Sequence, residues 1–222
     1  MAPTFQSLQQ EADDRSLVRK LQRAIAFIAP TSVDLPATLF EAGGTLVDLK
    51  SAGWLPVGLV TPDGYEFSRE VSKSDVSALG YASPVRSDVD SVARSIKMTA
   101  LETGKKHMLE LTYGTDLSTV TQATATGEIV IDEPDLPINA EYRLLVLGSD
   151  GPAADNWILG RGYGLVKLAA TDSQKWGTSD ALTQSYTFDV FTDDEIGTPV
   201  RHYIGGTGAV KNKLALGFSA GA

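Results

Sequence analysis

Two acidic stretches and two histidines are the residues whose types and spacing could support chemistry. The carboxylates of residues 132–135 could act as an acid–base pair on a glycosidic bond, and those of residues 193–195 could bind calcium. The first stretch, however, flanks prolines in a predicted loop, and the second lacks the spacing and distal glutamate of an EF-hand loop. His107 and His202 lie far apart in the sequence and are more readily interpreted as structural residues than as general bases. No set combines a nucleophile, a base and an orienting residue.

Two glycine-rich stretches resemble nucleotide-binding loops only superficially. Residues 160–164 lack the GxGxxG spacing, and residues 205–208, although Lys211 follows them, lack the terminal Lys-Ser/Thr pair of a phosphate loop. The chain has no cysteine, which excludes disulfides, thiolate nucleophiles and cysteine-bound metals. The sequence therefore predicts a protein that is not an enzyme and that has no catalytic, cofactor-binding or metal-binding residues.

Charge is distributed unevenly along the 222 residues, whose formal net charge is −9. Such an acidic protein repels nucleic-acid phosphates. Residues 128–155 contain seven acids and a single base, Arg143, whereas no acid follows Glu195 and the C-terminal segment carries Arg201, Lys211 and Lys213. An acidic body with a basic tail could let one copy attract another. The alternative is a solvated acidic face and a mobile terminus, and charge alone favours this alternative.

The chain shows no signal for membrane insertion or export. No apolar run approaches the ~18–20 residues that span a bilayer. The first 16 residues lack the basic start, apolar core and cleavage site of a secretory signal.

Alternating apolar and polar residues predict a mainly β fold of two packed antiparallel sheets, a sandwich or barrel, with one flanking helix. The clearest strand is 182–191, and 142–147 is apolar on both faces, as in a central strand. Residues 87–101 change their polar face midway, which indicates a bulge or a strand that leaves its domain. The helix is predicted over 103–113, with Thr103 as its N-cap and Gly114 at its C-terminus. Further strands are predicted at 23–29, 54–60, 65–67, 128–131, 163–169 and 201–204.

Residues 68–86 are polar, with few apolar residues, and are predicted to be a long loop between strands. We expect 64–86 to be poorly ordered in an isolated subunit and to become ordered against neighbouring chains, with Tyr65, Phe67, Leu79 and Tyr81 as the anchors. The whole chain, 1–222, is predicted to be one domain. Residues 1–22 and 205–222 form its terminal arms.

Four stretches together resemble the major tail, or tail-tube, proteins of siphophages that infect actinobacteria. They are GWLPVGLVTPDGYEF (53–67), ALGYASPVRSDVDSVARSIKMTALE (78–102), EYRLLVLGSDGPAADNWILGRGY (141–163) and FTDDEIGTPVRHYIGGTGA (191–209). Because they extend from the second predicted strand into the C-terminal arm, the resemblance covers most of the chain.

This resemblance implies a structural virion protein that assembles in the host cytoplasm. Subunits would form hexameric rings, and stacked rings would form a tube around the tape-measure protein, bounded by tail-terminator and tail-tip proteins. DNA would pass through this tube during ejection without specific binding, and no membrane would be involved. The long loop, 64–86, and the terminal arms would join successive rings.

An acidic lumen is the finer expectation. Asp189 shares a face with Ser185 and Thr187, opposite the apolar face of its strand, and Asp88 and Asp90 lie on the polar part of 87–101. Repeated around a ring, such residues would repel phosphate.

The competing function is a β-sandwich adhesion or carbohydrate-binding module of a virion. Such a module would cluster exposed aromatic residues, whereas Trp54, Trp157 and Trp176 are scattered.

Overall fold

The computed structural model describes residues 3–219, and its regular structure is mainly β. The strands are β1 (Arg23–Pro30), β2 (Leu55–Pro56), β3 (Val60–Val76), β4 (Arg86–Ala100), β5 (Glu141–Asp150), β6 (Trp157–Thr171), β7 (Gln184–Phe191) and β8 (Arg201–Gly205). The α-helices are α1 (Phe5–Ala12), α2 (Lys106–Tyr113), α3 (Thr207–Lys211) and α4 (Lys213–Leu216), and short 3-10 helices cover Arg15–Leu17 and Ala153–Asp155. The predicted mainly β class is confirmed.

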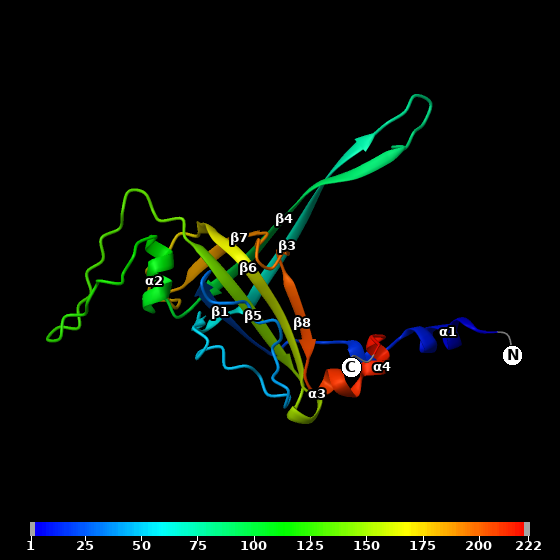
Figure 1. Cartoon of the computed structure of the whole chain (residues 1–222), viewed down its shortest axis with the longest axis horizontal. Coiled ribbons are helices and arrows are strands. Elements are labelled where there is room, and N and C mark those ends of the chain that lie inside the picture. Colours follow the sequence, from blue (N-terminus) through cyan, green and yellow to red (C-terminus); the bar gives the residue numbers. More distant parts are fainter. Residues whose placement is uncertain (1–2, 220–222) are drawn as a thin grey trace.

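All eight strands belong to one antiparallel sheet in the order β2-β1-β5-β6-β7-β4-β3, with β8 also paired to β6 (Figure 1). The long strand β6 has β5 on one side. On its other side, it pairs first with β8 over Ile158–Gly162 and then with β7 over Leu165–Thr171. The strands therefore form one continuous sheet, where the sequence predicted two.

This single sheet curls until its inner face packs against itself. Phe67 in β3 and Tyr163 in β6 are three strand positions apart, a separation of about 14 Å in a flat sheet. Their ring centroids are nevertheless only 6.4 Å apart, and the rings are stacked. The curl produces the two packed layers that the alternating sequence pattern predicts, without a break between them.

The main core lies inside the curl. It combines alternate residues of β1, β4, β5 and β7 with Met108 and Leu111 of helix α2. A second cluster lies on the other face of β1 and β5, where Leu145 and Leu147 pack under Trp54 and the preceding loop. Because both faces of β5 are covered, its apolar residues do not alternate with polar ones, as predicted for a central strand.

The structure differs from the sequence-based predictions in three segments. Helix α2 begins at Lys106 with Lys105 as its N-cap, so Thr103 is not the cap, although Gly114 does end the helix with a φ of 58°. The segment 128–131 forms no strand and lies in an irregular stretch between α2 and β5. Most of the predicted loop 68–86 is instead the outer part of a β3–β4 hairpin, and only residues 77–85 connect its strands.

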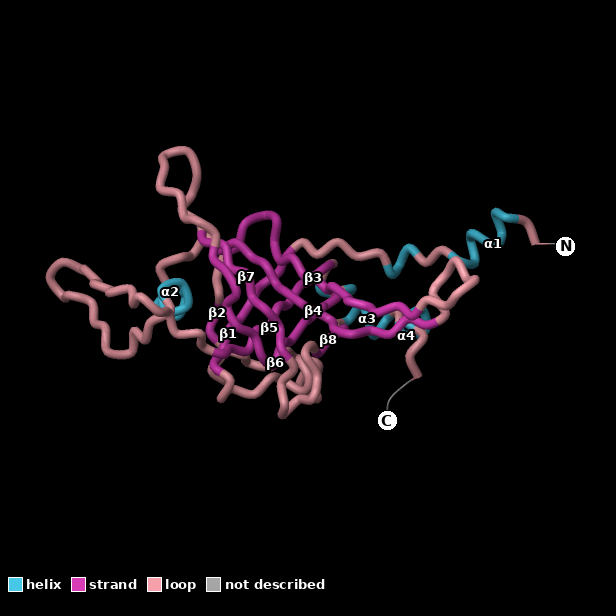
Figure 2. Tube along the Cα trace, turned by 90° about the horizontal axis from the view of Figure 1, so that it is seen from above, coloured by secondary structure: helices cyan, strands magenta, loops and turns pink. Residues whose placement is uncertain are grey.

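Projections extend from both ends of the long axis of the molecule (Figures 1 and 2). The β3–β4 hairpin and the helices α1, α3 and α4 project at one end. Helix α2 and the irregular segment 115–140 lie at the opposite end. The two ends of the molecule therefore present different structures, a hairpin with terminal helices at one end and a helix with an irregular segment at the other.

Candidate assembly surfaces

The outer half of the β3–β4 hairpin is a two-stranded arm that leaves the body of the protein. Its pairing continues from Ser68↔Ser95 to Val76↔Arg86, and every β3 residue from Ser68 to Val76 is exposed. A register shift beyond Ser72 leaves Asp90 as an extra residue in β4, a β-bulge. Both of the expected explanations for 87–101 therefore hold, because the strand contains a bulge and also runs out of its domain.

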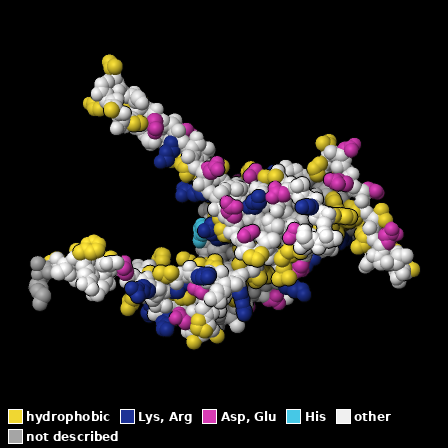
Figure 3. Space-filling model, turned by 180° about the vertical axis from the view of Figure 1, so that it is seen from behind, with side chains coloured by type: hydrophobic (Ala, Val, Ile, Leu, Met, Phe, Trp, Pro, Cys, Tyr) yellow, Lys and Arg dark blue, Asp and Glu magenta, His cyan; other side chains and the backbone are white. Residues whose placement is uncertain are grey.

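Apolar side chains gather at the tip of the arm (Figure 3). Leu79 is 104% exposed and Tyr81 is 71% exposed. Val76 and Val85 flank them and are also exposed. Residues 76–85 contain no charged side chain. The tip therefore presents two exposed side chains, Leu79 and Tyr81, which are two of the four residues predicted as anchors.

The other two predicted anchors lie at the base of the arm, against the core of their own chain. The Phe67 ring stacks on Tyr163, and the Arg161 guanidinium lies 4.1 Å from the Phe67 ring centroid. Tyr65 is half-buried beside the same core. Both rings already pack within their own chain. We therefore keep only the tip residues, Leu79 and Tyr81, as proposed anchors.

Tyr65 also lines a groove of about 510 Å³ between the base of β3 and the strands β5, β6 and β8. Its hydroxyl is buried and has no hydrogen-bond partner, and burial raises the pKa of Tyr65 to about 12. The groove is mostly apolar, with Arg161 and His202 among its polar residues.

We expect Tyr65→Phe to raise the free energy of unfolding by ~1 kcal/mol at neutral pH, because it removes a buried hydroxyl that has no partner. The gain should grow above pH 10. There the unfolded wild-type tyrosine loses its proton while the folded one keeps it to about pH 12, so wild-type stability falls with rising pH. Urea unfolding from pH 7 to 11 tests this, with the exposed Tyr81→Phe as control. Equal stability of both variants at all pH values would contradict it.

Asp189 lies exposed on the outer face of the curled sheet, opposite the buried Phe188 face of β7. It is level with Ser95 of β4 and Lys167 of β6. The same outer face carries the Thr99–Ser185 hydrogen bond of 2.8 Å. This face is therefore polar and mixed in charge.

Asp88 and Asp90 do not share this face, because they lie on the arm. Asp88 is seven residues from Ser95 along β4, or about 23 Å in an extended strand. Its carboxylate pairs with Arg86 at 2.6 Å, and Asp90 accepts a hydrogen bond from Ser74. Within one subunit, the three predicted lumen residues therefore form two separate groups.

Both terminal arms attach to the turn between β5 and β6. The Arg19 guanidinium lies 3.9 Å from the Trp157 ring centroid. Gly208 of α3 contacts the indole of Trp157 so closely that any side chain there would overlap it. The Thr207 hydroxyl accepts from the Asn156 amide and donates to the Ala153 carbonyl. The bases of the two arms are thus held at one place, and their outer parts extend from it.

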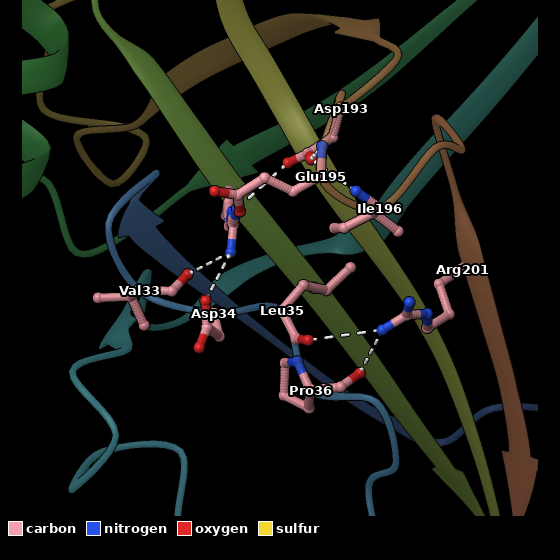
Figure 4. Close-up of polar contacts among 9 residues, drawn as sticks. Val33, Asp34, Leu35, Pro36, Asp193, Glu195, Ile196 and Arg201 are labelled. Carbon is pink, nitrogen blue, oxygen red and sulfur yellow. Dashed lines mark hydrogen bonds and ion pairs between the residues drawn. The ribbon is translucent and has the colours of Figure 1, made fainter.

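An ionic cluster around the buried Arg143 holds the loops around β5 together (Figure 4). The Arg143 side chain is only 3% exposed and donates to the Val33 carbonyl at 3.0 Å. It also pairs with Asp193 at 3.3 Å and Glu195 at 2.7 Å. The acidic stretch 193–195 is therefore engaged by this arginine and by its own turn, whose backbone amides donate to Asp193. Its role is structural.

The histidines and acids that could support chemistry are not brought together. A ring nitrogen of His107 lies 3.0 Å from the Pro56 carbonyl, and burial lowers the pKa of this histidine. His202 lies on β8 and lines the groove, whose lining includes no residue of helix α2. Within residues 3–219, no group of three or more His, Asp or Glu side chains could hold a metal ion. No helix in that range is long and apolar enough to cross a membrane.

Comparisons with known proteins give only remote similarities. No protein-family model matches the chain, and no curated protein matches its sequence. One similar solved structure is a chain of the "virion of native gene transfer agent (GTA) particle", at 10% identity and a TM-score of 0.35, covering 72% of this chain and 92% of that chain. Another is the tube-terminating cap of the anti-feeding prophage, at 10% identity and a TM-score of 0.42, covering 87% of this chain and 97% of that chain.

Proposed function

We propose that this chain is a structural virion protein, the major tail-tube subunit of a siphophage. In this proposal, subunits form hexameric rings that stack around the tape-measure protein and later conduct DNA. Tail-terminator and tail-tip proteins bound the tube. The sequence resemblance supports a tail tube as the kind of assembly. The exposed arm supports the more general proposal that subunits associate with one another.

The arm is the observation that carries the proposal. An isolated two-stranded ribbon is at best marginally stable in water, because it buries almost no apolar surface. The outer arm has this disadvantage along its whole length, and it also leaves both edges of the ribbon unpaired. Leu79 and Tyr81 at its tip contact nothing that would offset the cost of ordering it. A neighbouring subunit would cover these groups.

The polar outer face of the sheet fits the wall of a water-filled channel. Ser185, Thr187 and Asp189 point away from the core, and Lys97 and Lys167 lie among them. Because the nearby lysines pair with Asp172 and Glu141, this face offers few free cations to hold DNA phosphates. We retain Asp189 as the proposed lumen residue and assign Asp88 and Asp90 to the arm as a separate group.

We expect virions carrying Asp189→Lys to assemble normally but to eject DNA more slowly, with a larger effect at low salt. Each ring would then present a band of cations that attracts phosphate within about one Debye length, ~8 Å at physiological salt. Single-particle ejection kinetics at two salt concentrations measure this, with Glu41→Lys as control for the same charge change. Unchanged kinetics in particles with normal tails would count against a lumen position.

The proposed assembly is tested by the size of the purified full-length chain at rising concentration. Light scattering should detect species far larger than the 23.6 kDa subunit, and negative-stain electron microscopy should show rings or tubes. A binding or adhesion module would stay small in the same experiment. Trp176 is the exposed one of the three tryptophans, since Trp54 and Trp157 are buried, so the tryptophans give that alternative no clustered surface.

A further inference from the structure

Segment 115–140, between α2 and β5, has an unusual combination of length, irregularity and exposed aliphatic residues. It forms no strand or helix, and short turns supply its internal hydrogen bonds, such as Ala123 to Glu128 and Gln122 to Gly127. Val130 and Leu136 are exposed, the latter by 86%. A long irregular segment of this kind is usually functional or ordered by a partner.

The same segment is acidic. It contains Asp116 and four acids between residues 128 and 135, and it contains no lysine or arginine. Glu133 and Asp135 are exposed, and neither has an ion-pair partner among residues 3–219. In Figure 3, acidic and hydrophobic side chains follow one another along the projection at the right of the molecule.

The C-terminal helices α3 and α4 have the complementary properties. Leu214 in α4 is 90% exposed and Phe218, just after α4, is 78% exposed, so this C-terminal region presents apolar side chains to solvent. Their charged residues are Lys211 and Lys213, and residues 207–219 contain no acid. Lys211 lies 3.6 Å from Asp155, whereas Lys213 has no ion-pair partner in the described part of the chain.

These two surfaces cannot meet within one molecule. Segment 115–140 projects at one end of the long axis, and α3 and α4 lie at the other in both views (Figures 1 and 2). Two copies in the same orientation, placed end to end, would bring the helices of one copy to the segment of the next. Such a head-to-tail contact generates an open stack when the rotation between copies does not close into a ring.

We infer that the C-terminal helices of one copy dock on segment 115–140 of the next copy along the stack. The occupant is a second copy of this chain, selected by opposite charge and by apolar side chains on both surfaces. This inference rests on the proposed stacking of subunits, in which the terminal arms join successive rings, and adds segment 115–140 as the surface that receives the C-terminal helices.

Charge reversal tests the contact. One variant carries Lys211→Glu and Lys213→Glu, a second carries Glu133→Lys and Asp135→Lys, and a third carries all four changes. We expect each two-site variant to raise the concentration needed for assembly by about tenfold, because attraction becomes repulsion. The four-site variant should return toward wild type, since its opposite charges face each other again.

The control variant carries Glu41→Lys and Asp180→Lys, which repeats the charge change at exposed positions on other loops. Circular dichroism of every variant checks folding, and light scattering measures assembly. If wild type assembles and the two-site variants assemble equally well, or the four-site variant shows no recovery, this contact is overturned while the proposed function stands. If wild type stays a monomer at all concentrations, the proposed function and this contact both fall.

Discussion

Replacing Leu79 and Tyr81 together by serine is expected to abolish ring and tube formation while leaving the subunit folded. Both side chains are exposed at the tip of the arm, so their loss removes little contact within the chain. In an assembled state, full burial of a leucine side chain contributes about 1.5–3 kcal/mol, and a tyrosine at the centre of an interface contributes ~2 kcal/mol or more. The loss is repeated at every subunit of a ring, so its effect on assembly is large.

Light scattering of the purified variant measures this result, and thermal unfolding checks that the fold is intact. Leu59→Ser is the matched control, because Leu59 is an exposed leucine on the body of the protein. If the tip variant formed tubes at wild-type concentrations, the arm tip would not be an anchor. If its subunit unfolded at a much lower temperature, the tip would instead have a structural role within the chain.

Arg143→Ala should destabilise the subunit by ~3–5 kcal/mol, because it leaves a buried carboxylate without its cation. The Asp193 side chain is 7% exposed and lies 3.3 Å from the guanidinium. The change also removes the hydrogen bond to the Val33 carbonyl, which ties the loop after β1 to β5. The arginine thus holds two loops on one strand.

Arg86→Ala is the informative comparison for this cluster. The Arg86–Asp88 pair is shorter, at 2.6 Å, but its side chains are 70% and 50% exposed. Solvent screening limits such a pair to about 0–1 kcal/mol. Urea unfolding should therefore show a larger loss of stability for Arg143→Ala than for Arg86→Ala, because burial of the ion pair matters more than its length. Similar losses of stability in the two variants would show that the buried cluster does not hold the loops as described.

Strands with one buried face were predictable from sequence, because burial imposes alternation. In β7, Tyr186 and Phe188 are buried as the pattern predicted. Gly114 ends helix α2 in a left-handed conformation, as a C-terminal glycine should. These signals are local, so they survive without knowledge of the tertiary structure.

The arm and the curl of the sheet were not predictable in the same way. A ribbon that leaves the body has no buried face, so residues 68–76 carry no alternation and resemble a loop. The opposite error affected 128–131, where aliphatic residues indicate a strand but have no neighbouring strand to pair with. The packing of Phe67 on Tyr163 depends on how the sheet bends, which pairs residues 96 positions apart.

The candidate site was predictable only in part for the same reason. Leu79 and Tyr81 lie on a tip whose composition marks it as a turn, and the structure leaves them exposed. Tyr65 and Phe67 have similar sequence surroundings but lie where β3 still belongs to the sheet. Asp189 was separable from Asp88 and Asp90 only once the register of β4 with β7 was available. Their roles in assembly and in the lumen remain predictions.

A cryo-electron microscopy reconstruction of the assembled full-length protein would show whether the chain forms a tail tube. We expect stacked hexameric rings, with Leu79 and Tyr81 buried against a neighbouring subunit and Asp189 on the wall of the central channel. Particles that remain single subunits at every concentration would contradict the tube proposal. Tubes whose arm tips stay free in solvent, or whose Asp189 faces the outside, would contradict the roles assigned to those residues.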